Sequence, residues 1–543
     1  MMKAFLERKF KSIKKLYEST DVLFLIFLIL FLNVKLPLKL AALVLIYTFR
    51  FNFEFGLSLK KKSRLPQFYV LMILLCILEF FLTLNFSTPY ILLFSACTCL
   101  WGVSFLVIHQ IKLAIEKNGT EKIRNALEIF LALNIAVSLW NLFIIMIETR
   151  SVNPYTFEGL SYKYFISTGD NIRGITADVC TTNMIINAFG LFYFLSQRKY
   201  WFSLASLVVI LMTTSNLGNI ILLIFLIVVF ITDSSKLNKS IMLCYISLMV
   251  VFMIKVSPSN LDYYKGLYIK MTQQDKPNTV GVTPPVKRTL NSDSLLLVFV
   301  SRKHFERKQK QVGAQGKAER ENAFHEIRKK IEGYRFPVEM KDPSFDMYER
   351  NIHDKVADYC KTIYGDSLTS GDIPLLKDHK IPGKLVSFAE TMNNATGSIK
   401  SFVFGEGPGN FSSKMAFRAL GLNIDGTWPS AYTCYSDKFR DNHLKLWLFY
   451  RIQPPAEHSV INHPNSCANQ LMGEYGLAGT LLFLVYYAGY FVRRFKFLSY
   501  GKIIFPLLLV FMGVDYWFEN LSVVVIFEVM ILLDLQRERT AEG

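Results

Sequence analysis

Residues 217–232 read LGNIILLIFLIVVFIT, an apolar run without a single charged side chain. Such a run is typical of a helix that crosses a lipid bilayer. Similar runs recur up to residue 255 and again after residue 470, whereas the stretch between them is polar. The sequence therefore predicts an all-α polytopic membrane protein with about twelve transmembrane helices. The expected spans are 21–34, 36–49, 67–85, 88–109, 127–147, 178–196, 200–213, 217–232, 240–255, 475–492, 502–516 and 519–534.

Composition excludes most other classes of protein. Of the 543 residues, 52% are hydrophobic and 19% are charged, whereas a soluble chain carries about 25% charged residues. The high hydrophobic fraction, concentrated in long runs, excludes a soluble enzyme, a disordered protein, a collagen and a disulfide scaffold. The eight cysteines form no CxxC or Cys/His zinc pattern, and a bridge between Cys360 and Cys434 stays open. The first two runs form either a tight hairpin or one broken helix.

The net charge of +18 has two candidate causes, nucleic-acid binding and membrane topology. The lysines and arginines gather in alternate short loops, as the positive-inside rule requires, so we expect no nucleic-acid partner. With a cytoplasmic N-terminus, every short loop obeys that rule. The first run has no cleavage site after it and is expected to be a retained anchor. The resulting division is 1–20 basic cytoplasmic N-terminus, 21–255 nine helices, 256–470 outer insert, 471–535 three helices, and 536–543 cytoplasmic C-terminus.

Three segments on the outer side carry candidate chemistry. Residues 171–178 read NIRGITAD, and Arg173 can clamp a phosphate or simply anchor the helix that follows. Residues 404–411 read FGEGPGNF, a tight turn that lacks the ending of a P-loop. Residues 463–480 read HPNSCANQLMGEYGLAGT. There His463 is either a proton acceptor or a solvated loop histidine, and Glu474 stands near the membrane edge. In the insert, residues 317–333 are expected to form a solvated helix.

The order of these segments resembles the O-antigen ligase and polymerase superfamily of bacterial envelope glycosyltransferases. The resemblance rests on Arg173-Gly174, on TTSN at 213–216, on GEGPGNF at 405–411, on His463 to Gly479, and on Glu519. It covers roughly residues 165–535. It implies a bacterial inner-membrane protein whose insert is periplasmic and mainly helical.

The chain departs from the family pattern at two positions. Counting back from Glu474, the family histidine falls on Asn465, so His463 and Asn465 compete for that role. Asn216 replaces the usual arginine, which leaves Arg440 and Arg451 as alternative suppliers of a phosphate contact. The resemblance thus implies His463 and Arg173 as catalytic residues. It implies substrate-binding roles for Arg440, Arg451, Asn465, Glu474 and Glu519.

The resemblance also implies the reaction. The donor would be an undecaprenyl-diphosphate-linked oligosaccharide, and the acceptor a sugar hydroxyl on a second glycan or on lipid A-core. Arginines would stabilise the leaving diphosphate, and His463 would accept the hydroxyl proton. No cofactor and no metal ion are expected. A polymerase is preferred over a ligase because position 465 lacks the histidine. A flippase and a chain-length regulator are candidate partner proteins.

Two other classes of protein, a transporter and a structural scaffold, are also compatible with the sequence. A transporter of lipid-linked glycans would show internal repeats and charged residues deep in its spans. No repeat is visible, and Glu79 and Glu528 are the acids deep in apolar runs. A structural membrane scaffold would tolerate changes at Arg173 and His463.

Overall fold

The structure is a computed structural model. It describes residues 17–50, 65–117, 119–156, 168–233, 235–256, 355–365, 368–378, 381–422, 424, 426–453 and 458–542. Within these ranges it contains helices and no strands, which confirms the all-α class. The expected helix at 317–333, like most of the first half of the insert, lies outside the described residues.

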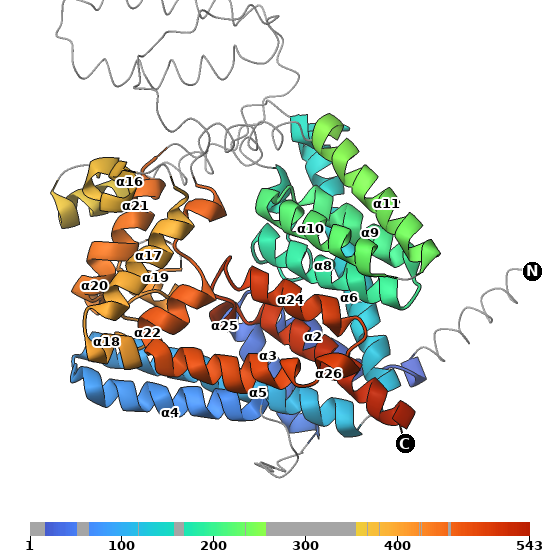
Figure 1. Cartoon of the computed structure of the whole chain (residues 1–543), viewed down its shortest axis with the longest axis horizontal. Helices are drawn as coiled ribbons and strands as arrows, with labels where there is room; N and C mark the ends of the chain where they lie inside the picture. The colour runs from blue at the N-terminus through green and yellow to red at the C-terminus, as the bar shows by residue number, and fades with distance from the viewer. Residues whose placement is uncertain are drawn as a thin grey trace, which may run out of the picture.

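Each of the twelve predicted runs overlaps a helix (Figure 1), and the run at 475–492 continues from α22 through the π-helical turn η10 Phe483–Ala488 into α23 Gly489–Val492. The helices are α2 Val22–Phe31, α3 Leu36–Arg50, α4 Leu65–Thr83, α5 Thr88–Lys117, α6 Thr120–Thr149, α8 Cys180–Ser196, α9 Tyr200–Met212, α10 Asn216–Thr232, α11 Lys236–Val251, α22 Cys467–Leu482, α24 Gly501–Phe511 and α26 Ser522–Glu542. α2 and α3 are separate helices packed on each other, so the first pair is a hairpin. All eight cysteines are free, including Cys360 and Cys434.

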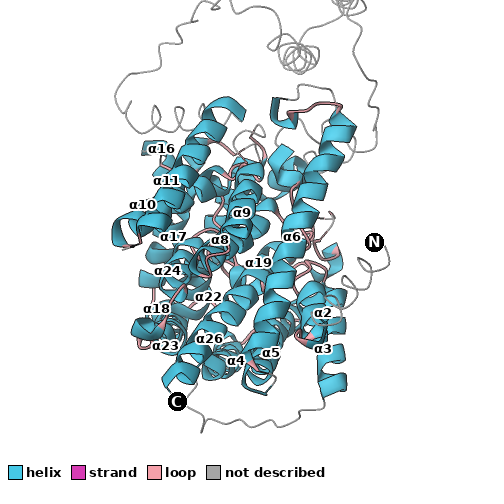
Figure 2. Cartoon of the chain, turned by 90° about the vertical axis from the view of Figure 1, so that its right-hand side faces the viewer, coloured by secondary structure: helices cyan, strands magenta, loops and turns pink. Residues whose placement is uncertain are grey.

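The second half of the insert folds into short helices that gather beside the start of α22, at the left of Figure 1. They are α16 Pro374–Asp378, α17 Gly383–Thr396, α18 Ile399–Phe404, α19 Lys414–Arg418, α20 Asp437–Phe439 and α21 Lys445–Arg451, with α25 Trp517–Asn520 between α24 and α26. A five-residue π-helical turn, η7 Arg440–Leu444, joins α20 to α21. Figure 2 shows the same molecule from the side, as a bundle built of helices and loops in its described part.

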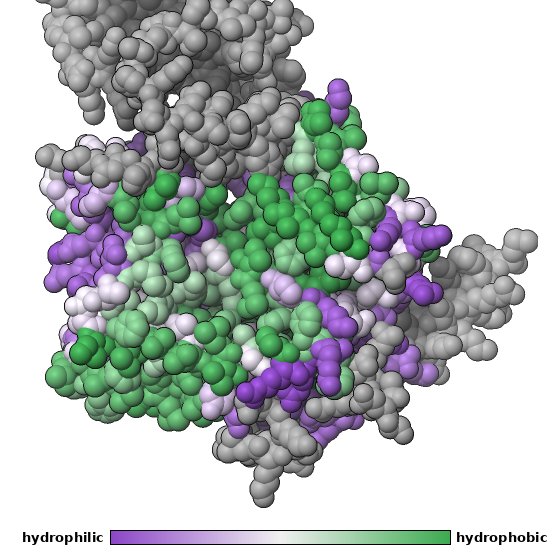
Figure 3. Space-filling view, in the orientation of Figure 1, coloured by the Kyte–Doolittle hydropathy of each residue, from purple (hydrophilic) through white to green (hydrophobic). Residues whose placement is uncertain are grey.

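Membrane character follows from length and hydropathy. Among the described residues, four helical stretches are long and apolar enough to cross a bilayer: Thr88–Lys117, Thr120–Thr149, Lys236–Val256 and Val460–Val492. Six shorter apolar helices accompany them. Hydrophobic side chains cover the middle of the face in Figure 3, and hydrophilic ones gather at the left and lower right. The chain therefore has the composition and the helices of a membrane protein.

Hydrogen bonds identify two opposite ends of the bundle. At one end, the N–H of Val34 donates to the carbonyl of Thr176, and the N–H of Cys467 donates to Met512. α3, α8, α22 and α26 begin there, and we call it the His463 end. At the other end the N–H of Asp21 donates to the carbonyl of Lys122. α2, α6, α9 and α24 begin there, and we call it the Lys199 end.

Candidate functional site

The turn at 405–411 is bonded to the first half of α22, so two of the three segments come together. The N–H of Glu406 donates to the carbonyl of Gly473, and the N–H of Gly407 to that of Glu474, both at 3.0 Å. These bonds satisfy carbonyls next to an interruption of α22 at Gly476, whose φ of 58° and ψ of −156° are not helical. A broken helix in a membrane protein needs such replacement partners.

Glycine is required where the two backbones meet. Gly405 has φ 76° and ψ −163°, and both it and Gly476 occupy a region that essentially only glycine adopts. A Cβ on Gly476 would lie 2.6 Å from the N atom of Gly405, and one on Gly405 would lie 2.4 Å from the carbonyl carbon of Glu474. The glycines of both segments therefore allow two segments of the backbone to cross in close contact.

Glu474 holds this turn from inside the protein. Its side chain is fully buried. Its Oε2 accepts a hydrogen bond from the N–H of Gly409 at 2.9 Å, and its Oε1 accepts from those of Ser412 at 3.0 Å and Phe411 at 3.4 Å. Three N–H donors around one carboxyl group replace the hydrogen bonds to water that its oxygens lose on burial. Glu474 thus organises the turn and presents no oxygen to solvent.

Glu519 binds the backbone just beyond the residues that Glu474 holds. Its Oε2 accepts from the N–H of Met415 at 3.0 Å, and its Oε1 accepts from Nε2 of Gln470 at 2.7 Å. The neighbouring Lys414 donates to Oδ1 of Asn520. Glu474 and Glu519 therefore bind four N–H groups between residues 409 and 415 and fix this segment against α22 and α25.

A buried histidine that the sequence analysis did not select links the insert to the bundle. His443 on η7 is fully buried, and its Nε2 lies 2.8 Å from the carbonyl oxygen of Ser387 on α17. Because a carbonyl only accepts, Nε2 carries the proton and Nδ1 accepts from the Ser412 hydroxyl at 2.8 Å. Ser412 Oγ then accepts from the Tyr516 hydroxyl at 2.9 Å. Burial lowers the pKa of His443 to about 4, so the ring is neutral.

Lys384, at the start of α17, holds the loop that carries His463. Its ammonium donates to three carbonyls: His463 at 3.3 Å, Val514 at 2.9 Å, and Asn465. Burial lowers the pKa of Lys384 to about 8, against an opposite effect of Asp515, so the charge persists at neutral pH. The sequence offered no signal for this residue, because it is one of many lysines in a polar insert.

His463 itself is 9% exposed, and its Nε2 is buried without a hydrogen-bond partner among the described residues. Oδ1 of Asn465 is likewise buried without a hydrogen-bond partner among the described residues. Arg451, Lys384 and His458 are basic residues within electrostatic reach of the ring. A buried polar atom without a partner is uncommon and indicates a place for a ligand or water. The two residues that compete for the family histidine position therefore lie together.

Arg173 lies on the exposed surface of a loop at the His463 end. Its Nε donates to the carbonyl of Asp170 at 3.3 Å. The loop is fixed by Asn141, whose Oδ1 accepts from Gly174, and by Asn134, whose Oδ1 accepts from Ile175. Within the described part of the chain, no hydrogen bond or ion pair joins Arg173 to His463.

The two other predicted arginines differ in their surroundings. Arg440 pairs with Asp437 and Asp441, both at 2.8 Å, so its charge is already compensated. Arg451, at the end of α21, lies over the Trp447 ring at 5.4 Å and within electrostatic reach of His463. Of these arginines, Arg451 is the better placed to act beside His463.

Further charges at the His463 end were missed by the sequence analysis. Lys39 is 5% exposed and donates to the carbonyl of Phe31 at 2.7 Å. Asp178 and Lys414 are the charges that reach it, and Asp515 lies within reach of Lys414 and Lys384. Lys39 had a signal, namely a lysine inside an expected apolar span.

These contacts describe a half-buried end at which Lys384 and Arg451 bring positive charge close to His463. Among the described residues, no group of three or more His, Cys, Asp and Glu side chains is placed to hold a metal ion. The arrangement can attract an anion, and the ring of His463 can accept a proton beside it. No family model, curated protein or solved structure matches this chain.

Proposed function

We propose that this chain is a membrane glycosyltransferase of the O-antigen polymerase and ligase type. It transfers a glycan from an undecaprenyl-diphosphate-linked donor to a sugar hydroxyl at the His463 end. The observation that carries the proposal is the bonding of the turn at 405–411 to Gly473–Gly476, two segments more than 60 residues apart that the resemblance groups together.

The surroundings of His463 support the chemistry. Displacement at the anomeric carbon places negative charge on the leaving diphosphate, which fixed cations stabilise best in a partly buried site. Lys384 and Arg451 supply such charge beside the ring. The partnerless Nε2 of His463 is the atom that accepts the proton of the acceptor hydroxyl. Arg173, on the exposed loop, contacts the donor as it enters the site.

The proposal includes a topology. Twelve spans place the His463 end and the insert in the periplasm of a bacterium and the Lys199 end in the cytoplasm. The apolar helices would hold the prenyl chain of the donor. Both termini are then cytoplasmic, and the flippase and chain-length regulator are neighbours in the inner membrane.

The test compares three variants in a strain whose own copy of the gene is deleted. His463→Ala should lower transfer by about 10²- to 10⁴-fold, the usual contribution of a general base. Arg451→Gln should lower it by about 10²-fold, the usual loss of one charge-stabilising donor. Lys361→Gln, an exposed lysine of the insert, is the matched control. The readout is the glycan length ladder, scored at equal protein abundance. Unchanged ladders in both test variants would contradict the assignment.

The same experiment separates the alternatives. A polymerase variant leaves single repeats attached, whereas a ligase variant accumulates lipid-linked polymer and attaches nothing. A transporter would carry labelled lipid-linked glycan across reconstituted vesicles without forming a glycosidic bond.

A further inference from the structure

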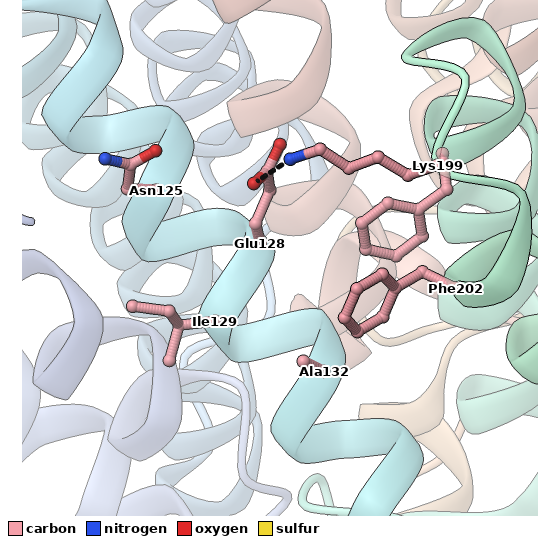
Figure 4. A pocket seen from close by; sticks show the side chains of 7 residues that line it. Asn125, Glu128, Ile129, Ala132, Lys199 and Phe202 are labelled. Carbon is pink, nitrogen blue, oxygen red and sulfur yellow. Dashed lines mark hydrogen bonds and ion pairs between the residues drawn. The ribbon is translucent and has the colours of Figure 1, made fainter. Parts of the chain in front are cut away.

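A cavity lies at the Lys199 end, away from the site described above. Its volume is about 210 Å³. It opens between α6 on one side and α8 and α9 on the other (Figure 4). The lining residues are Asn125, Glu128, Ile129, Ala132, Phe194 and Phe202, with Lys199. The lining is thus mostly apolar, with three polar side chains.

An ion pair crosses one end of the cavity. Nζ of Lys199 lies 2.5 Å from Oε2 of Glu128, and Figure 4 shows the lysine reaching across towards Glu128 on α6. Glu128 also accepts from the Tyr193 hydroxyl at 3.0 Å, so its carboxylate has two donors. The ammonium has three N–H groups and uses one on Glu128. Its side chain is 42% exposed, so the other two can reach a ligand from outside.

The position of the cavity indicates what enters it. Arg198 and Lys199 are followed by Tyr200 and Trp201, and Trp201 is 83% exposed. Basic and aromatic residues in this order are typical of the level of the lipid headgroups. A volume of about 210 Å³ is small for a whole ligand, because such pockets usually measure about 300–1,000 Å³. It suits part of a chain that continues into the bilayer.

We propose that this cavity binds one anionic phospholipid, with an acyl chain against Phe194 and Phe202 and the phosphate on Lys199. The apolar lining gives water few partners, so an alkyl chain displaces it favourably. Arg198 adds a second positive charge beside the headgroup, which favours an anionic lipid over a zwitterionic one. The site is independent of the transferase proposal.

The test measures binding of fluorescent phosphatidylglycerol to the full-length protein in detergent. Lys199→Gln should weaken binding by about five- to tenfold, because one lysine contributes about 1 kcal/mol at a membrane surface. Ala132→Trp should abolish it by filling the cavity. Glu128→Gln should strengthen it, since the ammonium is released from its carboxylate. Lys236→Gln, an exposed lysine at the start of α11, is the control and should bind like the parent.

Three results would overturn the proposal. Equal binding of phosphatidylcholine would remove the role of headgroup charge. Full competition by inorganic phosphate would show a phosphate site without a lipid chain. Weaker binding by Glu128→Gln would show that the ion pair only maintains the fold. Each variant is first compared with the parent in thermal unfolding, so that loss of structure is not taken for loss of binding.

Discussion

At the scale of single residues, Glu474, a buried acid, and Lys384, a partly buried base, have defined partners. Glu474 accepts from three backbone N–H groups, and Lys384 donates to three carbonyls. Both are positioning residues: one shapes the turn at 405–411, and the other shapes the loop that carries His463. A side chain that binds several backbone groups cannot be replaced without loss of stability.

Glu474→Gln is expected to lower the free energy of unfolding by about 2 kcal/mol, because an amide NH₂ would face a backbone N–H donor and at least one of the three hydrogen bonds would be lost. Glu121→Gln is the control, since Glu121 has a 76% exposed side chain and should change little. Thermal unfolding in detergent measures both. Equal melting temperatures would show that the hydrogen bonds of the Glu474 side chain do not stabilise the turn.

Protonation of His443 should make the free energy of unfolding depend on pH. Its folded pKa is about 4 and its unfolded value about 6.5, so the unfolded chain binds the proton first as the pH falls. Stability is therefore lost between about pH 6.5 and pH 4, by at most about 3 kcal/mol. The loss should shrink in His443→Gln and persist in His458→Gln. Melting curves across this range measure it, and parallel pH profiles for parent and His443→Gln would refute it.

At the scale of elements, the helices were predictable and their irregularities were not. Twelve apolar runs overlap twelve helices because each run carries its own hydropathy signal. The interruption at Gly476 and the π-helical turn η7 have no such local signal, since each depends on contacts with distant segments. The glycines of 405–411 and 473–479 were noted as motifs, but only the fold shows that they meet.

A pair of glycine variants tests the crossing. Gly476→Ala is expected to lose about 3 kcal/mol or more, because alanine is strained at this φ and its Cβ would strike the backbone of Gly405. Gly102→Ala on α5 meets nothing within 4 Å in the described part of the chain and should be neutral or stabilise by up to about 1 kcal/mol. Thermal unfolding in detergent again compares the two. A tolerated Gly476→Ala would mean that the two backbones do not cross so closely.

At the scale of the whole molecule, the candidate site was predicted in part. The sequence selected His463, Asn465, Glu474 and Glu519 from their order along the chain, and they lie at one end of the bundle. It missed Lys39, Lys384 and His443, whose roles arise from contacts between residues far apart in sequence. Arg440 was selected from its expected side of the membrane, but nearby aspartates compensate its charge.

Topology can be tested by thiol labelling in intact cells. In a chain whose exposed Cys99 and Cys244 and partly exposed Cys434 are replaced by serine, Val152→Cys should react with a membrane-impermeant maleimide. Val152 is 89% exposed, beyond the end of α6. Ser196→Cys, at the Lys199 end, should react only after permeabilisation. Labelling of both from the same side would contradict the proposed orientation.

The hydrogen bonds from Glu406 and Gly407 to α22 have a practical consequence for anyone who re-engineers this protein. A boundary drawn at residue 470 would separate the donors from the acceptors of one shared set of main-chain bonds. An excised insert would leave these N–H groups without their acceptors, and the remaining bundle would leave the carbonyls of Gly473 and Glu474 without their donors. Chimeras should therefore exchange residues 383–480 as one continuous segment.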